Sequence, residues 1–145
     1  RINDEYGHVV GDAVLETIAD VLRSTTRTID IAARYGGDEL ALVLLETGAP
    51  GGTILADRLR ENVRTAKIST LERGAVTVSV GAATLPDCAG DTQSLVDAAD
   101  QALLVAKRTG KDQTRSAPGR PRVERNGRGR RAQASRSSAR RRASG

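Results

Sequence analysis

The sequence predicts one domain of mixed α-helices and β-strands (α/β, or α+β), followed by a tail of different composition. Three observations lead to this fold class. Apolar residues repeat at helical spacing in three segments, apolar or β-branched runs between them are typical of strands, and clusters of Gly, Pro and polar residues separate the two kinds. The 145 residues are enough for one modest hydrophobic core.

The first helix is expected from about Gly11 to Ser24, because its apolar positions share one face and charged residues occupy the other. Asp12 stands at the expected start, where a side-chain oxygen can cap free backbone N–H groups. Capping is therefore an alternative to any functional role for Asp12. His8 is the single histidine of the chain, and local hydrogen bonding is the ordinary role of such a residue.

A β-hairpin is expected next, with strands around residues 31–35 and 40–45. Its turn has two glycines followed by two adjacent carboxylates, namely Gly36, Gly37, Asp38 and Glu39. The glycines permit a backbone with φ > 0 and close approach of a ligand. Carboxylates on a rigid turn suit Mg²⁺-dependent phosphoryl or nucleotidyl transfer, because hard cations take oxygen ligands. An ordinary hairpin with solvated acidic residues is about equally compatible with these residues alone.

The rest of the domain is expected to form a helix, a strand and a helix. Residues 49–52 include a proline and two glycines that should break the chain, and a helix over 53–67 follows. Residues 75–83 alternate β-branched and small residues, as a strand does. The third helix is expected to begin at Thr92, which can act as its cap, and to end at Gly110.

Charge divides the chain after Asp112. Residues 113–145 contain 11 arginines and one acidic residue, net +10, whereas residues 1–112 have a net charge of −5. The pI of about 10.1 therefore describes the tail and not the domain. The tail cannot bury enough apolar surface to fold, so we expect it to be disordered. Its arginines could contact nucleic acid or anionic lipid by charge, although a solvated tail without a dedicated partner is more common.

Cysteine content and hydropathy bear on the cellular location. Cys88 is the only cysteine, which excludes an intrachain disulfide, and no run of about 18 apolar residues could span a membrane. We expect a cytoplasmic domain, within a protein that could itself be attached to a membrane. The chain begins at Arg1 without a signal-peptide pattern, and we expect it to be part of a longer protein.

Four spaced segments resemble the GGDEF domain of diguanylate cyclases. They are residues 3–12 (NDEYGHVVGD), 34–39 (RYGGDE), 76–81 (VTVSVG) and 99–107 (ADQALLVAK). The resemblance covers residues 1–112, and residues 113–145 form the separate basic tail. It implies a palm-like, ferredoxin-like nucleotidyl cyclase sheet with helices packed around it. It also implies condensation of two GTP into cyclic di-GMP and two pyrophosphates, by a head-to-tail homodimer in which each domain presents one GTP.

The resemblance implies roles for the residues of the nucleotide site. Asn3 and Asp12 would hydrogen-bond the guanine, and His8 would line the same site. Asp38 would bind Mg²⁺, or Mn²⁺ in its place, and help to deprotonate the ribose 3′-hydroxyl that attacks the α-phosphate; Glu39 completes the acidic signature.

The remaining substrate contacts implied by the resemblance come from the turn glycines and from two lysines. Gly36 and Gly37 would approach the nucleotide, and Lys107 and Lys111 would neutralise its terminal phosphates. All four belong to segments that match the family in order and spacing or follow such a segment directly.

A second, inhibitory site for the product is implied by an RxxD pair. Arg27 and Asp30 form this pair just before the first strand, and Arg58 occupies the position of a further arginine of the site. An arginine fork suits phosphate and guanine contacts. The alternative is an exposed Arg–Asp pair on a loop, which contributes little to stability.

The chain also departs from the family pattern. Leu40 replaces a usual Phe, Leu104 stands where Tyr is common, and Lys111-Asp112 replaces Arg-Asn. The family's first strand, with a metal-binding aspartate, and a sensory domain are expected before Arg1. The 145-residue chain alone is therefore expected to be inactive and incompletely folded. A degenerate module that binds cyclic di-GMP or GTP without catalysis, and a basic-tailed interaction protein, stay open as alternatives.

Overall fold

The computed structural model describes residues 6–68 and 71–120. The elements are α2 (His8–Thr25), β1 (Ile31–Arg34), β2 (Leu40–Val43), α3 (Ala49–Thr65), β3 (Val80–Ala82), α4 (Thr92–Arg108) and β4 (Thr114–Ser116). This mixture confirms the expected fold class. Within these residues, none of the helices combines the length and the apolar character needed to cross a membrane.

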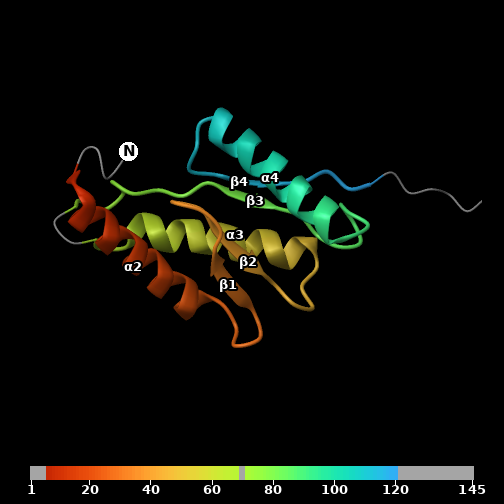
Figure 1. The fold of residues 1–145 in the computed structure, drawn as a ribbon, viewed down its shortest axis with the longest axis horizontal. Coiled ribbons are helices and arrows are strands. Elements are labelled where there is room, and N and C mark those ends of the chain that lie inside the picture. Colours follow the sequence, from red (N-terminus) through yellow and green to blue (C-terminus); the bar gives the residue numbers. More distant parts are fainter. Residues whose placement is uncertain (1–5, 69–70, 121–145) are drawn as a thin grey trace, which may run out of the picture.

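The described strands form two separate pairs. β1 and β2 are an antiparallel hairpin in which Ile31 lies opposite Val43 and Arg34 opposite Leu40. β3 and β4 are parallel, with Val80 opposite Thr114. Both α3 and α4 contact the β3–β4 pair, whereas α2 packs against α3 and lies beside the hairpin (Figure 1). The parallel pair is thus covered by α3 and α4.

The hydrophobic core lies between α2, α3 and the segment that leads into β3. Its most buried members are Val14, Val63, Ile68 and Val76. On the other side of β3, α4 approaches very closely, because a Cβ atom on Gly81 would lie 2.2 Å from the Ala99 carbonyl oxygen. The absence of a side chain at this position allows strand and helix to pack backbone to backbone.

Two of the expected helix starts are wrong. α2 begins at His8 after Gly7, so Asp12 lies in its second turn and cannot act as the cap. α3 begins at Ala49 and includes the segment expected to break the chain. Pro50 is compatible with this position, because the first-turn N–H groups of a helix have no partner within it and the loss of one costs nothing.

α4 begins at Thr92 as predicted, but its capping residue differs from the prediction. Asp91, and not Thr92, is the N-cap, and its carboxylate accepts a hydrogen bond from the Ser94 N–H at 2.8 Å. The Ser94 hydroxyl in turn accepts one from the Asp91 N–H at 3.2 Å. These hydrogen bonds from Ser94, the backbone one first, hold the pKa of Asp91 below its ordinary value.

The expected end of α4 is confirmed. Gly110 has φ 123°, and the Lys111 N–H donates to the Ala106 carbonyl at 3.0 Å, which is a Schellman type of helix end.

Residues 114–116, which the expected tail included, form β4 beside β3. The Val80 N–H donates to the Gln113 carbonyl at 2.9 Å, and the Ala117 N–H to the Ala82 carbonyl at 2.7 Å. The expected strand over 75–83 is correspondingly short, because β4 pairs with three residues only and no other described strand lies beside it. Residues 121–145 of the expected tail lie outside the described part.

Candidate active site at the hairpin turn

The turn between β1 and β2 is held by backbone and arginine hydrogen bonds. The N–H groups of Tyr35 and Gly36 both donate to the Glu39 carbonyl, at 2.9 and 3.1 Å. The Arg34 guanidinium donates to the carbonyls of Gly36 (3.2 Å) and Gly37 (2.6 Å). The sequence patterns did not predict these arginine hydrogen bonds, although an arginine two residues before a glycine pair is a signal for them.

The two turn glycines do not adopt the positive φ angles that glycine permits. Positive φ occurs at the described glycines Gly7, Gly74 and Gly110, and not at Gly36 or Gly37. A Cβ atom on Gly37 would meet nothing within 4 Å, and one on Gly36 would make only ordinary contacts with the Glu39 side chain, the nearest at 3.5 Å. The five-residue loop avoids the strained angles of a two-residue turn. The fold therefore does not require glycine at either position.

An ion pair joins the turn to α4. Lys107 Nζ lies 2.8 Å from Glu39 Oε1, although the two residues are 68 positions apart in sequence. Both side chains are about half exposed, 46% and 45%. In Figure 1 the turn and the C-terminal end of α4 lie toward the same side of the molecule. The structure thus brings together two residues that the sequence assigned to one site.

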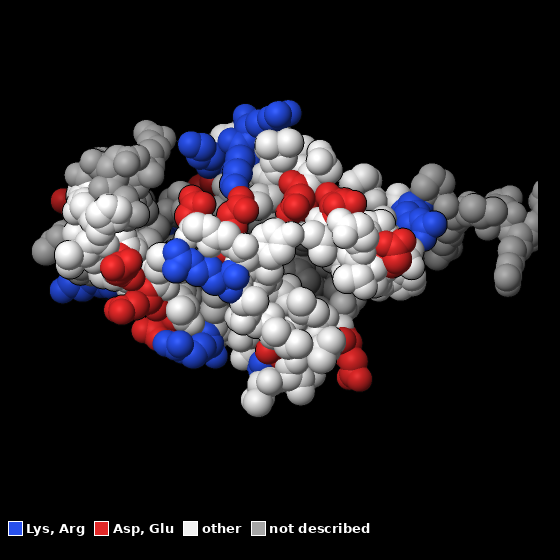
Figure 2. All heavy atoms as spheres, in the orientation of Figure 1, with Lys and Arg blue, Asp and Glu red and all other residues white. Residues whose placement is uncertain are grey.

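The carboxylate of Asp38 is exposed and makes no hydrogen bond or ion pair with the described residues. Basic side chains gather at the C-terminal end of α4, where Figure 2 shows them on the upper part of the surface. Lys107, Arg108 and Lys111 are all exposed there. Acidic oxygen ligands and a basic helix end therefore adjoin one another.

The carboxylates of the turn fit a magnesium ion in donor type but do not by themselves form a complete site. The described residues contain no group of three or more His, Cys, Asp or Glu side chains that could hold a metal. Mg²⁺ commonly uses one or two carboxylates together with water and substrate phosphates. The free Asp38 and the neighbouring Glu39 match this smaller ligand set.

The residues expected to bind guanine are placed only in part. His8 and Asp12 are both exposed and lie one helical turn apart on α2, so they share a face. Asn3 lies outside the described residues. No hydrogen bond or ion pair joins His8 or Asp12 to the described residues of the hairpin turn.

The RxxD pair forms a compact turn after α2. The Arg27 N–H donates to the Asp30 carboxylate at 2.9 Å, and the Asp30 N–H donates to the Arg27 carbonyl at 3.1 Å. Arg58 of α3 donates to the Thr25 carbonyl at 2.8 Å, at the end of α2. The structure thus brings Arg58 to the helix end next to this turn.

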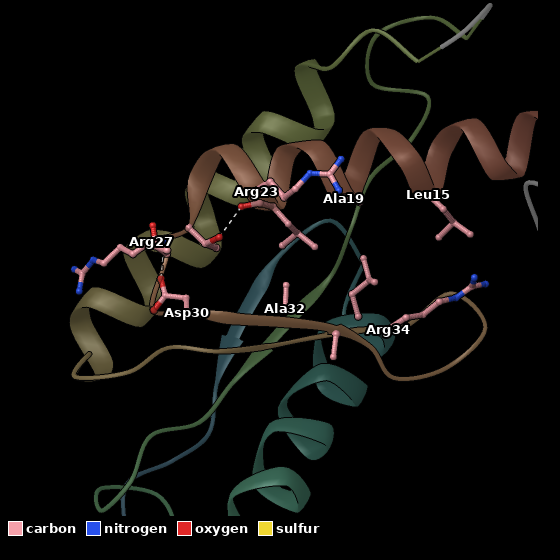
Figure 3. A pocket seen from close by; sticks show the side chains of 12 residues that line it. Leu15, Ala19, Arg23, Arg27, Asp30, Ala32 and Arg34 are labelled. Atoms are coloured by element: carbon pink, nitrogen blue, oxygen red, sulfur yellow. Dashed lines mark hydrogen bonds between the residues drawn. The ribbon is translucent and has the colours of Figure 1, made fainter.

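A cavity of about 690 Å³ lies between α2 and the hairpin, with the RxxD turn at one end (Figure 3). Leu15 and Ala19 of α2 face Ala32 of the hairpin across it, whereas the Arg27 guanidinium points outward. One oxygen of Asp30, Oδ1, is buried without a partner among the described residues.

The fold and the site define an α+β protein with an acidic, glycine-containing turn beside a basic helix end, a combination suited to metal-assisted chemistry on phosphates. The family model "Diguanylate cyclase, GGDEF domain" matches residues 1–113. The chain belongs to this family, as the spaced motifs predicted.

Known proteins support the same assignment. The chain is 38% identical over 113 residues to diguanylate cyclase A of Treponema denticola and 39% over 114 residues to diguanylate cyclase DgcP of Pseudomonas aeruginosa, in each case over 77% of its length. It spans only 30% and 17% of those two proteins.

Solved structures confirm the fold. The active GGEEF domain of a diguanylate cyclase from Vibrio cholerae aligns with a TM-score of 0.75 and 27% identity, over 82% of this chain and 76% of that one. The GGDEF domain of DgcB from Caulobacter crescentus, solved with c-di-GMP, aligns with a TM-score of 0.71 and 31% identity, over 80% and 70%.

Proposed function

We propose that this chain is the catalytic domain of a diguanylate cyclase, which condenses two GTP into cyclic di-GMP and two pyrophosphates. The observation that carries the proposal is the Glu39–Lys107 contact, which holds a basic helix end against the acidic turn while Asp38 stays unpaired. Names of relatives support it, since one aligned structure is described as an active domain and another contains c-di-GMP.

In the proposed reaction, Asp38 would hold Mg²⁺ or Mn²⁺ and would help to deprotonate the ribose 3′-hydroxyl. The metal, when bound, offsets the charge on the phosphates. Lys107 exchanges its Glu39 partner for a terminal phosphate, which leaves the second carboxylate of the turn available. Lys111, in the turn that follows the end of α4, contacts the same phosphates. Asn3, His8 and Asp12 bind the guanine.

The turn glycines support this proposal, because the fold does not explain them. Open space surrounds Gly37, and a side chain there would enter the volume in front of the turn. A bound nucleotide that approaches the backbone closely would account for the absence of side chains.

We further propose that catalysis requires a longer protein in which another strand completes the sheet and two domains form a homodimer. Among the described strands, β2 pairs only with β1 and β3 only with β4, so each has one unpaired edge. Ile31 and Val43, paired across the hairpin, are 56% and 51% exposed. Unpaired edges and exposed apolar residues both favour addition of a strand. We call the chain with its preceding encoded segment the extended protein.

Incubation with GTP and Mg²⁺, followed by chromatography of the products, tests the proposed function. The extended protein should form cyclic di-GMP as a dimer, and residues 1–145 alone should form none. Binding of cyclic di-GMP without synthesis would instead identify a sensor module. Absence of both synthesis and binding by the extended protein would overturn the proposal.

The proposed product feedback has its own test. Arg27→Ala should weaken cyclic di-GMP binding in calorimetry and relieve product inhibition, with an unchanged initial rate, because Arg27 lies at the opposite end of β1 from the turn. Arg23→Ala is the matched control, since Arg23 lines the same cavity but is paired with Asp20. Equal affinity of the Arg27 variant and the parent would leave Arg27 as a surface charge.

A further inference from the structure

The turn after α4 has an unusual backbone. Gly110, Lys111 and Asp112 have consecutive positive φ angles of 123°, 59° and 40°. Glycine adopts such angles freely and aspartate tolerates them, but a lysine in this region is strained by contact between its Cβ and the backbone. Contacts outside α4 must therefore hold Lys111 in this conformation.

An ion pair from another helix provides this restraint. Arg60 of α3 donates through Nη1 to Asp112 Oδ1 at 2.9 Å and to the Asp112 carbonyl at 3.3 Å. The two side chains are 24% and 33% exposed, so this pair is more shielded than the other described ion pairs, including the longer one of 4.0 Å between Arg60 and Asp57. One guanidinium nitrogen thus binds both the side chain and the backbone of the residue after Lys111.

The chain is also fixed directly after Asp112. The Gln113 carbonyl accepts the Val80 N–H at 2.9 Å, and the Gln113 side-chain amide donates to the Ala106 carbonyl at 3.1 Å. Arg60 therefore links α3 to a turn that otherwise makes its hydrogen bonds with α4 and β3. Without it, Lys111 and Asp112 would lose the hydrogen bonds that join them to α3 among the described residues.

From this geometry we infer that Arg60 and Asp112 are positioning residues that hold Lys111 toward the phosphate end of the bound nucleotide. The inference rests on the proposed function, in which Lys111 contacts those phosphates. The chemical class that Lys111 recognises is a polyphosphate. Pyrophosphate, which has no nucleobase, should therefore bind more weakly when Lys111 is no longer held in position.

The test is Arg60→Met in the extended protein, which keeps most of the apolar stem and removes the donor. KM for GTP should rise about five- to tenfold and pyrophosphate binding in calorimetry should weaken by the same factor, whereas kcat should stay within about twofold. Arg64→Met is the matched control, because Arg64 lies one turn along the same helix and its hydrogen bonds among the described residues go to Glu61 and not to Asp112. It should change neither quantity.

Two further variants separate positioning from general stability. In a Lys111→Met background, Arg60→Met should add no further loss, since its effect passes through Lys111. Asp112→Asn keeps an acceptor and tolerates positive φ, so it should behave like the parent, whereas Asp112→Ala should behave like Arg60→Met. Additive losses, or a fall in thermal stability with KM and pyrophosphate affinity unchanged, would overturn the inference.

The same measurements distinguish this inference from the proposed function. If Arg60→Met and Lys111→Met weaken pyrophosphate binding as expected but the extended protein forms no cyclic di-GMP, the positioning role stands and the cyclase proposal fails. If it forms cyclic di-GMP with an unchanged KM in Arg60→Met, the cyclase proposal stands and the positioning role fails. If it neither binds pyrophosphate nor forms product, both fail.

Discussion

Glycine occurs in two regions of this molecule for different physical reasons. In β3, Gly81 faces the backbone of α4, and an added Cβ would lie 2.2 Å from the Ala99 carbonyl oxygen and 2.4 Å from the Leu103 nitrogen. In the hairpin turn, a Cβ on Gly37 would meet nothing. Packing explains the first glycine, whereas nothing within the described fold explains the second. Residues that the fold leaves unexplained are therefore the better candidates for ligand contact.

Gly81→Ala should have the largest effect. The new methyl group collides with helix backbone, which cannot move aside as a flexible side chain could, so α4 must separate from β3. We expect the extended protein to lose about 3 kcal/mol or more of unfolding free energy, or its cooperative transition altogether. Chemical denaturation followed by circular dichroism measures this. Parent-like stability would show that α4 adapts to the methyl group.

Asp38→Asn should have the largest effect on activity without an effect on the fold. It removes a proposed metal-binding charge at an exposed position, so cyclic di-GMP synthesis should fall roughly 100-fold or more. The thermal midpoint should stay within about 2 °C, as for other exposed substitutions. Glu72→Gln, at an exposed position far along the chain, is the control. Activity within a few-fold of the parent would end the assignment of Asp38 as a metal ligand.

Gly37→Ala provides the direct counterpart to Gly81→Ala. Its methyl group fits the nucleotide-free fold, so stability should be unchanged or slightly higher, because alanine restricts the unfolded chain. Synthesis should nevertheless fall about tenfold, since the nucleotide could no longer approach the turn closely. Steady-state kinetics and thermal unfolding of the same preparation separate the two effects. An unchanged rate would mean that the turn does not touch the substrate.

Asp91→Ala should have the smallest effect, a decrease of a few degrees in the thermal midpoint at neutral pH. Its pKa is lowered in the folded state by the Ser94 hydrogen bonds, so the cap contributes its full stability above the unfolded pKa of about 3.9. This contribution is lost as pH falls through the lower folded pKa. The difference between variant and parent should therefore shrink in acid. Asp100→Ala, at an exposed position of the same helix, is the control for loss of a carboxylate that does not cap the helix.

Sequence patterns predicted the features that depend on neighbouring residues. The hairpin, the end of α4 at Gly110 and the apolar faces of three helices follow from spacing over a few positions, and all were found. Helix starts were less predictable: Pro50 breaks a helix interior but is compatible with a first turn, and Asp91 competes with Thr92 for the same cap. Such choices depend on small differences in free energy between adjacent positions.

The sequence by itself determined the family, the acidic turn and the identity of the candidate site residues, because these are properties of short segments in a fixed order. Only the tertiary structure decided which residues meet. The Glu39–Lys107 pair spans 68 positions and the Arg60–Asp112 pair spans 52, and β4 forms because β3 offers it a free edge. Contacts at such separations depend on how helices pack against strands, which no local spacing encodes.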